Sequence, residues 1–144
     1  MTKAYVDTNV ILRFLVGDPP DMAEEAARLF QAVDEGKLTL IVDNIIIAEV
    51  VWVLSSFYRH SISDVANTLR DFLLQEGIEA EEKDVLLQAL TLCETKNIDF
   101  TDALVAARMK KYNVEYVFSF DRHFDRVPGL QRTAPGNCSS LIAS

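Results

Sequence analysis

The chain has 144 residues, 49% of them apolar, and its 22 acidic side chains outnumber the 14 Lys and Arg to give a formal net charge of −8. This length suits one domain with a sizeable core and leaves little room for a second. The negative charge argues against a broad electrostatic grip on nucleic acid or on an anionic membrane. A nucleic-acid substrate is not excluded, because metal ions in an acidic pocket carry positive charge locally.

Nothing in the sequence predicts export or membrane insertion. The amino terminus lacks a basic stretch followed by an apolar core and a cleavage site. The most apolar run, residues 45–54, is too short to cross a bilayer and contains Glu49. Cys93 and Cys138 match no metal-binding or redox spacing and are read as two ordinary thiols. We therefore expect a cytoplasmic protein without a membrane partner.

The first half of the chain predicts strands that alternate with helices. Strands are expected at residues 3–6 and 38–42, and helices at residues 8–16, from 21 to a stop at 36, 45–58 and 62–75. Gly17 and the Asp18-Pro19-Pro20 break end the first helix. Predicted helix caps are Asp21, Asp43, and either Ser61 or Ser63.

The second half predicts helices at residues 83–95 and 102–112, the latter capped by Asp99 or Thr101. A buried strand is expected at residues 116–119 and a last short one at 130–133. Short apolar strands separated by helices favour a parallel sheet covered on both faces, and hence an α/β sandwich. We expect a single domain over residues 1–134 and a flexible tail over 135–144.

Four carboxylates lie next to apolar sequence that is expected to be buried, where an unpartnered charge would destabilise the fold. Asp7 and Asp121 directly follow predicted strands, and in an open parallel sheet the ligand site lies beyond the carboxyl ends of the strands. Asp102 lies in the first turn of its helix, where the helix dipole favours negative charge. Glu49 sits in an apolar helix whose residues three and four positions away are Ile45, Ile46, Trp52 and Val53.

A buried carboxylate needs a compensating partner, and a divalent metal ion is the natural one in a chain with few cations. Each acid also has a plainer interpretation. Asp7 can cap a helix, Asp102 can follow an Asp99 cap, and Asp121 can occupy a turn. Glu49 can pair with a buried Arg. Taken together, the pattern predicts a metal site formed by all four.

Neutral polar residues accompany the acids. Thr8, Asn9 and Ser119 can orient a ligating carboxylate or hold a metal-bound water. Helix capping and turn formation explain these residues nearly as well. Asp125 and His123 are weaker candidates, and His123 is read as a loop residue rather than a general base.

The arrangement resembles the PIN-domain ribonucleases, and within them the VapC-type toxins of toxin–antitoxin pairs. The resemblance covers nearly the whole chain and rests on YVDTNVIL at residues 5–12, Glu49, FTDALVAA at residues 100–107 and SFDRHFD at residues 119–125. It implies a Rossmann-like three-layer α/β/α sandwich with a short parallel sheet. It also implies hydrolysis of RNA phosphodiesters with Mg²⁺ or Mn²⁺, a homodimer, and inhibition by a cognate antitoxin.

Carried over to this sequence, the family's acidic positions are Asp7, Glu49, Asp102 and Asp121, with Thr8 and Ser119 as supporting hydroxyls. One departure is His123, where some relatives carry a further acid or amide. Two rival functions stay open. The chain could be a degenerate PIN fold that binds RNA or protein without cutting, or an aspartate-based phosphatase. Such phosphatases resemble one another in a second Asp two positions after the first, and here that position is Asn9.

Overall fold

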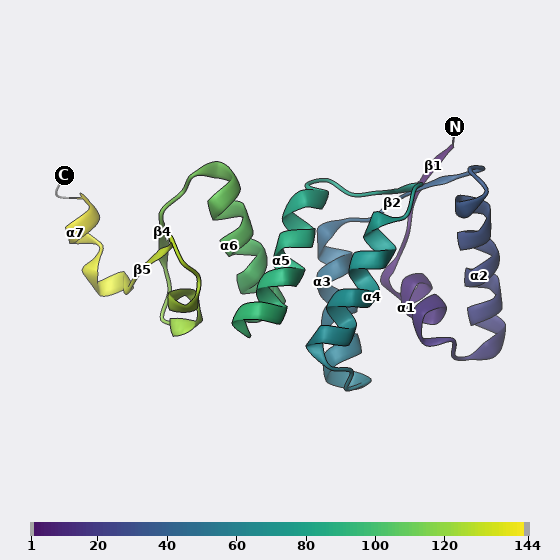
Figure 1. Ribbon diagram of the computed structural model, residues 1–144, viewed down its shortest axis with the longest axis horizontal. Helices are drawn as coiled ribbons and strands as arrows, with labels where there is room; N and C mark the ends of the chain where they lie inside the picture. The colour runs from purple at the N-terminus through teal and green to yellow at the C-terminus, as the bar shows by residue number, and fades with distance from the viewer. Residues whose placement is uncertain (1, 143–144) are drawn as a thin grey trace. The chain divides into compact units, whose positions relative to one another are not determined.

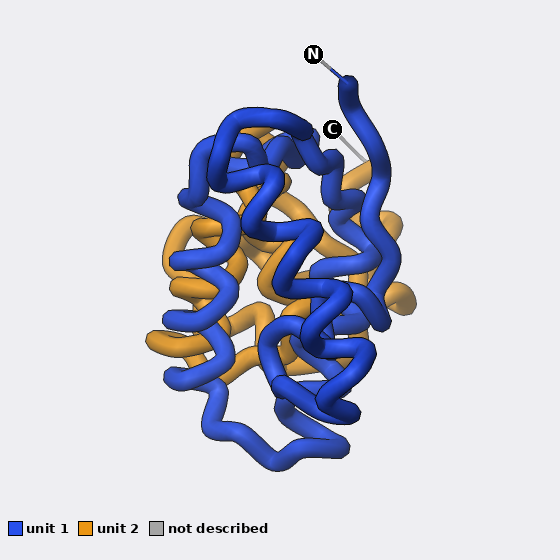
Figure 2. Tube along the Cα trace, turned by 90° about the vertical axis from the view of Figure 1, so that its right-hand side faces the viewer, with its two compact units in different colours: residues 1–83 blue, residues 84–144 orange. Residues whose placement is uncertain are grey.

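A computed structural model describes residues 2–142 and divides the chain into two compact units. Unit 1 comprises residues 1–83 and unit 2 residues 84–144 (Figure 2). Each unit is described by itself below. The expected single domain over residues 1–134 stays a prediction.

Unit 1 alternates short strands with helices, as the sequence predicts. Its elements are β1 (Lys3–Tyr5), α1 (Thr8–Val16), α2 (Pro20–Asp34), β2 (Thr39–Ile41), α3 (Asn44–Trp52), the π-helical turn η1 (Val53–Phe57), α4 (Ile62–Leu74) and β3 (Ile78–Glu79). The strands form one parallel sheet in the order β1-β2-β3. Figure 1 labels the first two of them, β1 and β2. Ala4 pairs with Leu40, and Leu40 pairs in turn with Ile78. Parallel neighbours require the helical crossovers that the sequence places between the strands.

The core of unit 1 is formed by apolar side chains from the helices and the sheet. Fully buried examples are Ile11, Leu40, Val42, Ile47, Val50, Leu69, Phe72, Leu73 and Ile78. Because these residues recur at helical and strand spacing, burial fixes which face of each element points inward. The end of β1 and the start of α1, where Asp7 lies, are thereby held in place.

Most predicted helix boundaries are confirmed. The helix predicted at residues 45–58 divides into α3 and the π-helical η1, and unit 1 shows two further differences. The second helix begins at Pro20 and has no side-chain cap, because proline is already set for the first helical position; the prediction that Asp21 caps it is wrong. The strand β3 was not predicted. It follows Gly77, whose φ is +90° and where an added Cβ would lie 2.8 Å from Val33 Cγ1. Only glycine fits this position.

Unit 2 begins within α5 (Lys83–Lys96) and is richer in irregular structure. Its further elements are α6 (Phe100–Tyr112), β4 (Tyr116–Phe118), the 3₁₀ helix η2 (Arg122–Arg126), β5 (Gln131–Thr133), the 3₁₀ turn η3 (Pro135–Asn137) and α7 (Ser139–Ile142). The strands β4 and β5 are parallel, with Val117 opposite Arg132. Buried apolar side chains come mainly from α5 and α6. The prediction that β4 is buried is wrong, because Tyr116 and Phe118 are exposed and Val117 is half-buried.

The predicted α/β fold with short parallel strands is confirmed, and the strands fall into two sheets, one in each unit. The expected tail contains η3 and α7, whose side chains are mostly exposed, so part of it is helical. Residues 143–144 of that predicted tail lie outside the described residues. Within residues 2–142, no helix combines the length and the apolar character needed to span a bilayer.

Candidate active site

Asp7 occupies the junction between β1 and α1. It is the N-cap of α1, and its Oδ1 accepts a hydrogen bond of 2.8 Å from the Thr8 backbone N–H. The N-terminal backbone amides and the dipole of the helix both favour a carboxylate here. The carboxylate is exposed, so a partner can reach it. Asp7 therefore caps a helix and still presents oxygen atoms to solvent.

Glu49 is tied to the same junction through Thr8. The Thr8 hydroxyl donates a hydrogen bond of 2.5 Å to Glu49 Oε2 and so joins α1 to α3. Thr8 is only 7% exposed, which makes its hydroxyl a fixed donor. The sequence predicts Thr8 as a supporting hydroxyl, and the structure gives it this geometry. Asp7 and Glu49 are thus brought to one place in unit 1 by a single threonine.

The prediction that Glu49 is buried is wrong. Its neighbours Ile45 and Trp52, four residues before and three after it, are each 66% exposed, and Glu49 shares their exposed face. The other face of α3 carries Ile47, Val50 and Val51 into the core. Because α3 is apolar on both faces, its sequence does not reveal which one is covered. Asp7 is likewise exposed rather than buried.

Asn9 lies apart from these two carboxylate contacts. It is exposed on α1 and lines a groove of about 400 Å³ whose other walls come from α1 and α2. The groove is mostly apolar, and its lining residues are Asn9, Val10, Arg13, Met22, Glu25, Ala26 and Leu29. The Nε atom of Arg13 is buried without a hydrogen-bond partner. Asn9 therefore borders a groove in unit 1.

Unit 2 brings Asp102 and Asp121 together. Asp102 lies in the first turn of α6, and Asp121 follows β4 and is the N-cap of η2. Desolvation raises the pKa of Asp102, and the nearby negative charges of Asp121 and Asp99 raise it further; His123 opposes the shift. Both carboxylates are half-buried rather than fully buried. A bound cation would neutralise these closely spaced negative charges.

Asp99 belongs to this acidic group, although the sequence analysis read it only as a possible cap. It is the N-cap of α6, yet its side chain makes no capping hydrogen bond. Instead, ligand atoms of Asp99, Asp102 and His123 all lie within 4.8 Å of one another. The spacing of three between Asp99 and Asp102 at the start of a helix was the available signal, since such residues are neighbours on one face.

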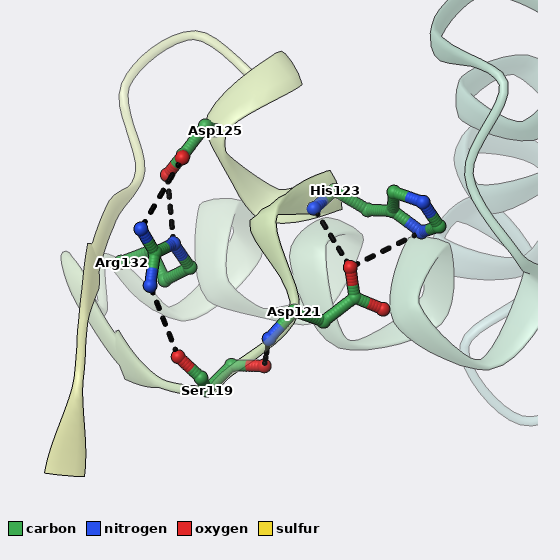
Figure 3. A network of polar contacts seen from close by, with 5 residues as sticks. All are labelled: Ser119, Asp121, His123, Asp125 and Arg132. Carbon is green, nitrogen blue, oxygen red and sulfur yellow. Dashed lines mark hydrogen bonds and ion pairs between the residues drawn. The ribbon is translucent and has the colours of Figure 1, made fainter.

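Ser119 and His123 hold Asp121 in position (Figure 3). The Ser119 hydroxyl oxygen accepts a 2.9 Å hydrogen bond from the Asp121 backbone N–H, and Asp121 Oδ1 accepts one of 2.8 Å from the His123 N–H. The His123 Nδ1 atom lies 3.3 Å from the same carboxylate oxygen. The predicted supporting role of Ser119 has this structural basis. His123, read from sequence as a loop residue, stands among the acids.

Asp125 makes a different contact. Its two carboxylate oxygens receive Nε and Nη2 of Arg132 at 3.0 and 3.4 Å, while Nη1 of the same guanidinium reaches the Ser119 carbonyl oxygen at 3.2 Å (Figure 3). This bidentate pair links η2 to β5. Asp125 therefore has a structural partner of its own. It supports the site by holding the segment that carries Asp121.

The donor set in unit 2 fits a divalent cation. Asp99, Asp102 and Asp121 supply carboxylate oxygens, and His123 supplies an imidazole nitrogen at the same place. Hard divalent cations prefer oxygen ligands, and ligating side chains are commonly held by further hydrogen bonds such as those around Asp121. The chemistry of these donors therefore suits a divalent metal ion.

The sequence that forms these two acidic groups matches a known protein family. The PIN domain family matches residues 4–130, which span both acidic groups. The chain belongs to the PIN domain family. The resemblance drawn from the sequence motifs is thereby confirmed. Asp7, Glu49, Asp102 and Asp121 lie within the matched residues, and their role as site residues stays a prediction.

Curated relatives of this PIN domain are ribonucleases by name. The chain is 27% identical over 122 residues to the VapC ribonuclease of Aquifex aeolicus, an alignment that covers 85% of this chain and 90% of the relative. It is also 27% identical over 129 residues to Ribonuclease VapC13 of Mycobacterium tuberculosis, with 90% and 98% covered. The VapC ribonuclease Mb1869c of Mycobacterium bovis matches to the same extent.

A crystal structure of VapBC2 from Rickettsia felis, bound to a DNA fragment from its promoter, includes a similar chain. The likeness covers 93% of this PIN domain and 98% of that chain, at 19% sequence identity and a TM-score of 0.38. The family assignment rests on the match over residues 4–130.

Proposed function

We propose that this PIN domain is a metal-dependent endoribonuclease, the toxin of a type II toxin–antitoxin pair. The observation that carries the proposal is the half-buried group in unit 2, where ligand atoms of Asp99, Asp102 and His123 lie within 4.8 Å of one another beside Asp121. Similarity to VapC ribonucleases over most of the chain supports RNA as the substrate. We assign Asp7, Glu49, Asp102 and Asp121 as the catalytic acids.

The roles of the residues follow from their contacts. Asp102 and Asp121, with Asp99, would hold Mg²⁺ or Mn²⁺, and Ser119 and Asp125 would keep Asp121 in place through the backbone of its segment. When bound, such a cation lowers the pKa of water and neutralises charge on phosphoryl oxygens, so that no Ser or His nucleophile is needed. Thr8 fixes the Glu49 carboxylate, and the exposed oxygens of Asp7 and Glu49 are free to orient a water or a cation.

The decisive experiment is cleavage of a mixed pool of structured RNAs with Mg²⁺ or Mn²⁺ and with a chelator. The wild-type chain should cut only with metal, and Asp7→Asn should lose cleavage while its thermal unfolding is unchanged, because Asn also caps helices well. Asp71→Asn is the matched control, since it removes one exposed charge from α4. Folded, metal-loaded wild-type protein that cuts nothing would favour the binding-only alternative.

The antitoxin is proposed to occupy the groove between α1 and α2. An apolar floor with one buried, unpartnered Arg13 Nε suits a segment that has apolar side chains and a hydrogen-bond acceptor. The net charge of −8 favours a basic partner. If the neighbouring gene encodes a small DNA-binding protein, that protein should block cleavage by wild type. It should fail against Met22→Lys, because Met22 is 50% exposed in the groove and the change spares the core.

We further propose a cytoplasmic homodimer. The exposed side chain of Phe57 in η1, which packs edge-on against Tyr58, offers an apolar surface that a second copy would cover without covering Glu49. Phe57→Glu should convert a dimer to a monomer in sedimentation experiments. Persistence of the dimer would place its interface elsewhere.

A further inference from the structure

The acidic group of unit 2 contains one nitrogen donor. His123 lies in the first turn of η2, and one of its ring nitrogens is within 4.8 Å of carboxylate oxygens of both Asp99 and Asp102. The donor set is therefore mixed, with oxygen from the acids and nitrogen from the imidazole. This distinguishes the site from one built of carboxylates alone.

The imidazole is held beside the acids by local structure. The His123 backbone N–H is bonded to Asp121 Oδ1 at 2.8 Å, which fixes the residue at the start of η2. Its Nδ1 atom is buried and lies 3.3 Å from the same oxygen, an ion-pair contact drawn as a dashed line in Figure 3, and it makes no hydrogen bond. The side chain as a whole is 38% exposed. The ring thus stands at the edge of the acidic group, with a nitrogen whose hydrogen-bonding capacity is unused.

A ring nitrogen changes which cation the site prefers. Mg²⁺ requires a near-octahedral set of oxygen ligands and keeps several waters, and it gains little from an imidazole. First-row transition ions accept imidazole readily, and Mn²⁺ also accepts carboxylates. Two or three carboxylates with one imidazole therefore discriminate against Mg²⁺.

We propose that His123 is a direct metal ligand and that it makes this PIN domain prefer Mn²⁺ over Mg²⁺. The proposal rests on the proposed metal centre and adds the identity of its ion. It assigns a specificity-determining role to His123 of the SFDRHFD motif.

The first test is spectroscopic and independent of RNA cleavage. Mn²⁺ is added to the full chain, and electron spin echo modulation reports whether an imidazole nitrogen is directly coordinated. Wild type should show the nitrogen signal, and His123→Asp should bind Mn²⁺ without it. His60→Asn is the matched control, because His60 is the other histidine of the chain and lies in unit 1; it should retain the signal.

The second test compares affinities by calorimetry. Loss of a group that only supports a metal ligand lowers metal affinity by roughly 10- to 100-fold. Because Mg²⁺ gains little from an imidazole, His123→Asp should lower the affinity for Mn²⁺ and not that for Mg²⁺. The ratio of Mn²⁺ to Mg²⁺ affinity should therefore fall at least about tenfold. The same ratio should be unchanged in His60→Asn. Circular dichroism verifies that each variant is folded.

The outcomes separate the two proposals. Mn²⁺ bound without a nitrogen signal, or an unchanged affinity ratio in His123→Asp, overturns the role of His123 and leaves the metal centre intact. Failure of the wild-type chain to bind either ion at millimolar concentration overturns the metal centre itself.

Discussion

Asp7 and Glu49 of unit 1 and Asp102 of unit 2 have opposite electrostatic environments. In unit 1, Asp7 accepts a backbone N–H and Glu49 accepts the Thr8 hydroxyl, so both carboxylates have donors from the chain. In unit 2, Asp102 is surrounded by the charges of Asp121 and Asp99, which raise its pKa together with desolvation. Asp7 and Glu49 therefore contribute to folding without a ligand. Asp102 opposes folding until a cation binds, whereas its neighbour Asp121 also accepts the His123 backbone N–H.

The largest effect expected from this difference concerns metal binding. Asp102→Asn removes a carboxylate from the unit 2 group and should lower Mn²⁺ affinity by about 10-fold or more. Asp7→Asn should lower it much less, although each substitution should reduce RNA cleavage by about 10³-fold, the scale for loss of one charge-stabilising group. Calorimetry and a cleavage assay measure the two quantities. Equal losses of Mn²⁺ affinity in both variants would break the distinction between the units.

The next effect concerns the stability of unit 1. Thr8→Val removes the hydroxyl that joins α1 to α3 and should cost about 1 kcal/mol, which corresponds to a fall in Tm of roughly 3 °C. Thr8→Ser keeps the donor and should retain most of the stability. Thermal unfolding in the presence of a chelator compares the three proteins. If valine and serine behave alike, the hydrogen bond to Glu49 contributes nothing to the fold.

In unit 2 we expect a smaller effect of opposite sign, because loss of the Asp102 charge should raise the stability of the folded chain. Because the pKa of Asp102 is raised above its ordinary value of 3.8, the protonated carboxyl is favoured in the folded chain. The resulting stability is present below that value and is lost as the pH rises through the folded pKa. Without metal, Asp102→Asn should therefore be close to wild type in stability at acidic pH and exceed its Tm at neutral pH.

Two controls apply to this pH dependence. Asp71→Asn removes one negative charge at an exposed position on α4 and should show no comparable gain in Tm at neutral pH. Excess Mn²⁺ should remove the advantage of Asp102→Asn, since only wild type gains from binding the cation. An Asn variant that is less stable than wild type at neutral pH would mark Asp102 as a structural residue.

The smallest effect probes the buried part of unit 2. Burial raises the pKa of the Cys93 thiol to about 12, and the charge of Asp99 adds to the shift, whereas Cys138 is exposed. A thiol reagent at neutral pH should therefore modify Cys138 in the native chain and reach Cys93 only after unfolding. Cys138→Ser should not react when native. Rapid modification of Cys93 would show that α5 is not closed to solvent.

The sequence predicts the elements of this PIN domain better than their exposure. Gly17, Asp43 and Ser61 mark helix ends in the structure as expected, because caps and breaks act through local backbone chemistry. The exposure of Glu49 could not be predicted, because α3 is apolar on both faces and only tertiary packing decides between them.

The candidate site was likewise predicted in part, and the rest depends on tertiary structure. Asp7 and Asp121 follow strands as the sequence predicts, but the two strands belong to different sheets. A single site formed by all four acids stays a prediction. The inclusion of Asp99 in the acidic group could not be predicted, because an Asp directly before a helix can serve either as a cap or as a metal ligand. Only the structure shows that its side chain makes no capping hydrogen bond. The place of His123 among the acids likewise depends on η2, a 3₁₀ helix with no strong sequence signal.

The π-helical turn η1 has a consequence for changes in chain length. In this turn the Tyr58 N–H reaches back five residues to the Val53 carbonyl oxygen, so it contains one residue more than an α-helical turn needs. Deleting one residue between Val53 and Phe57 would let the segment relax to an ordinary α-helix. The preceding helix, with Glu49 and its bond to Thr8, would keep its register. This turn is therefore a place in unit 1 where a homologue can lose a residue and keep the contact between Glu49 and Thr8.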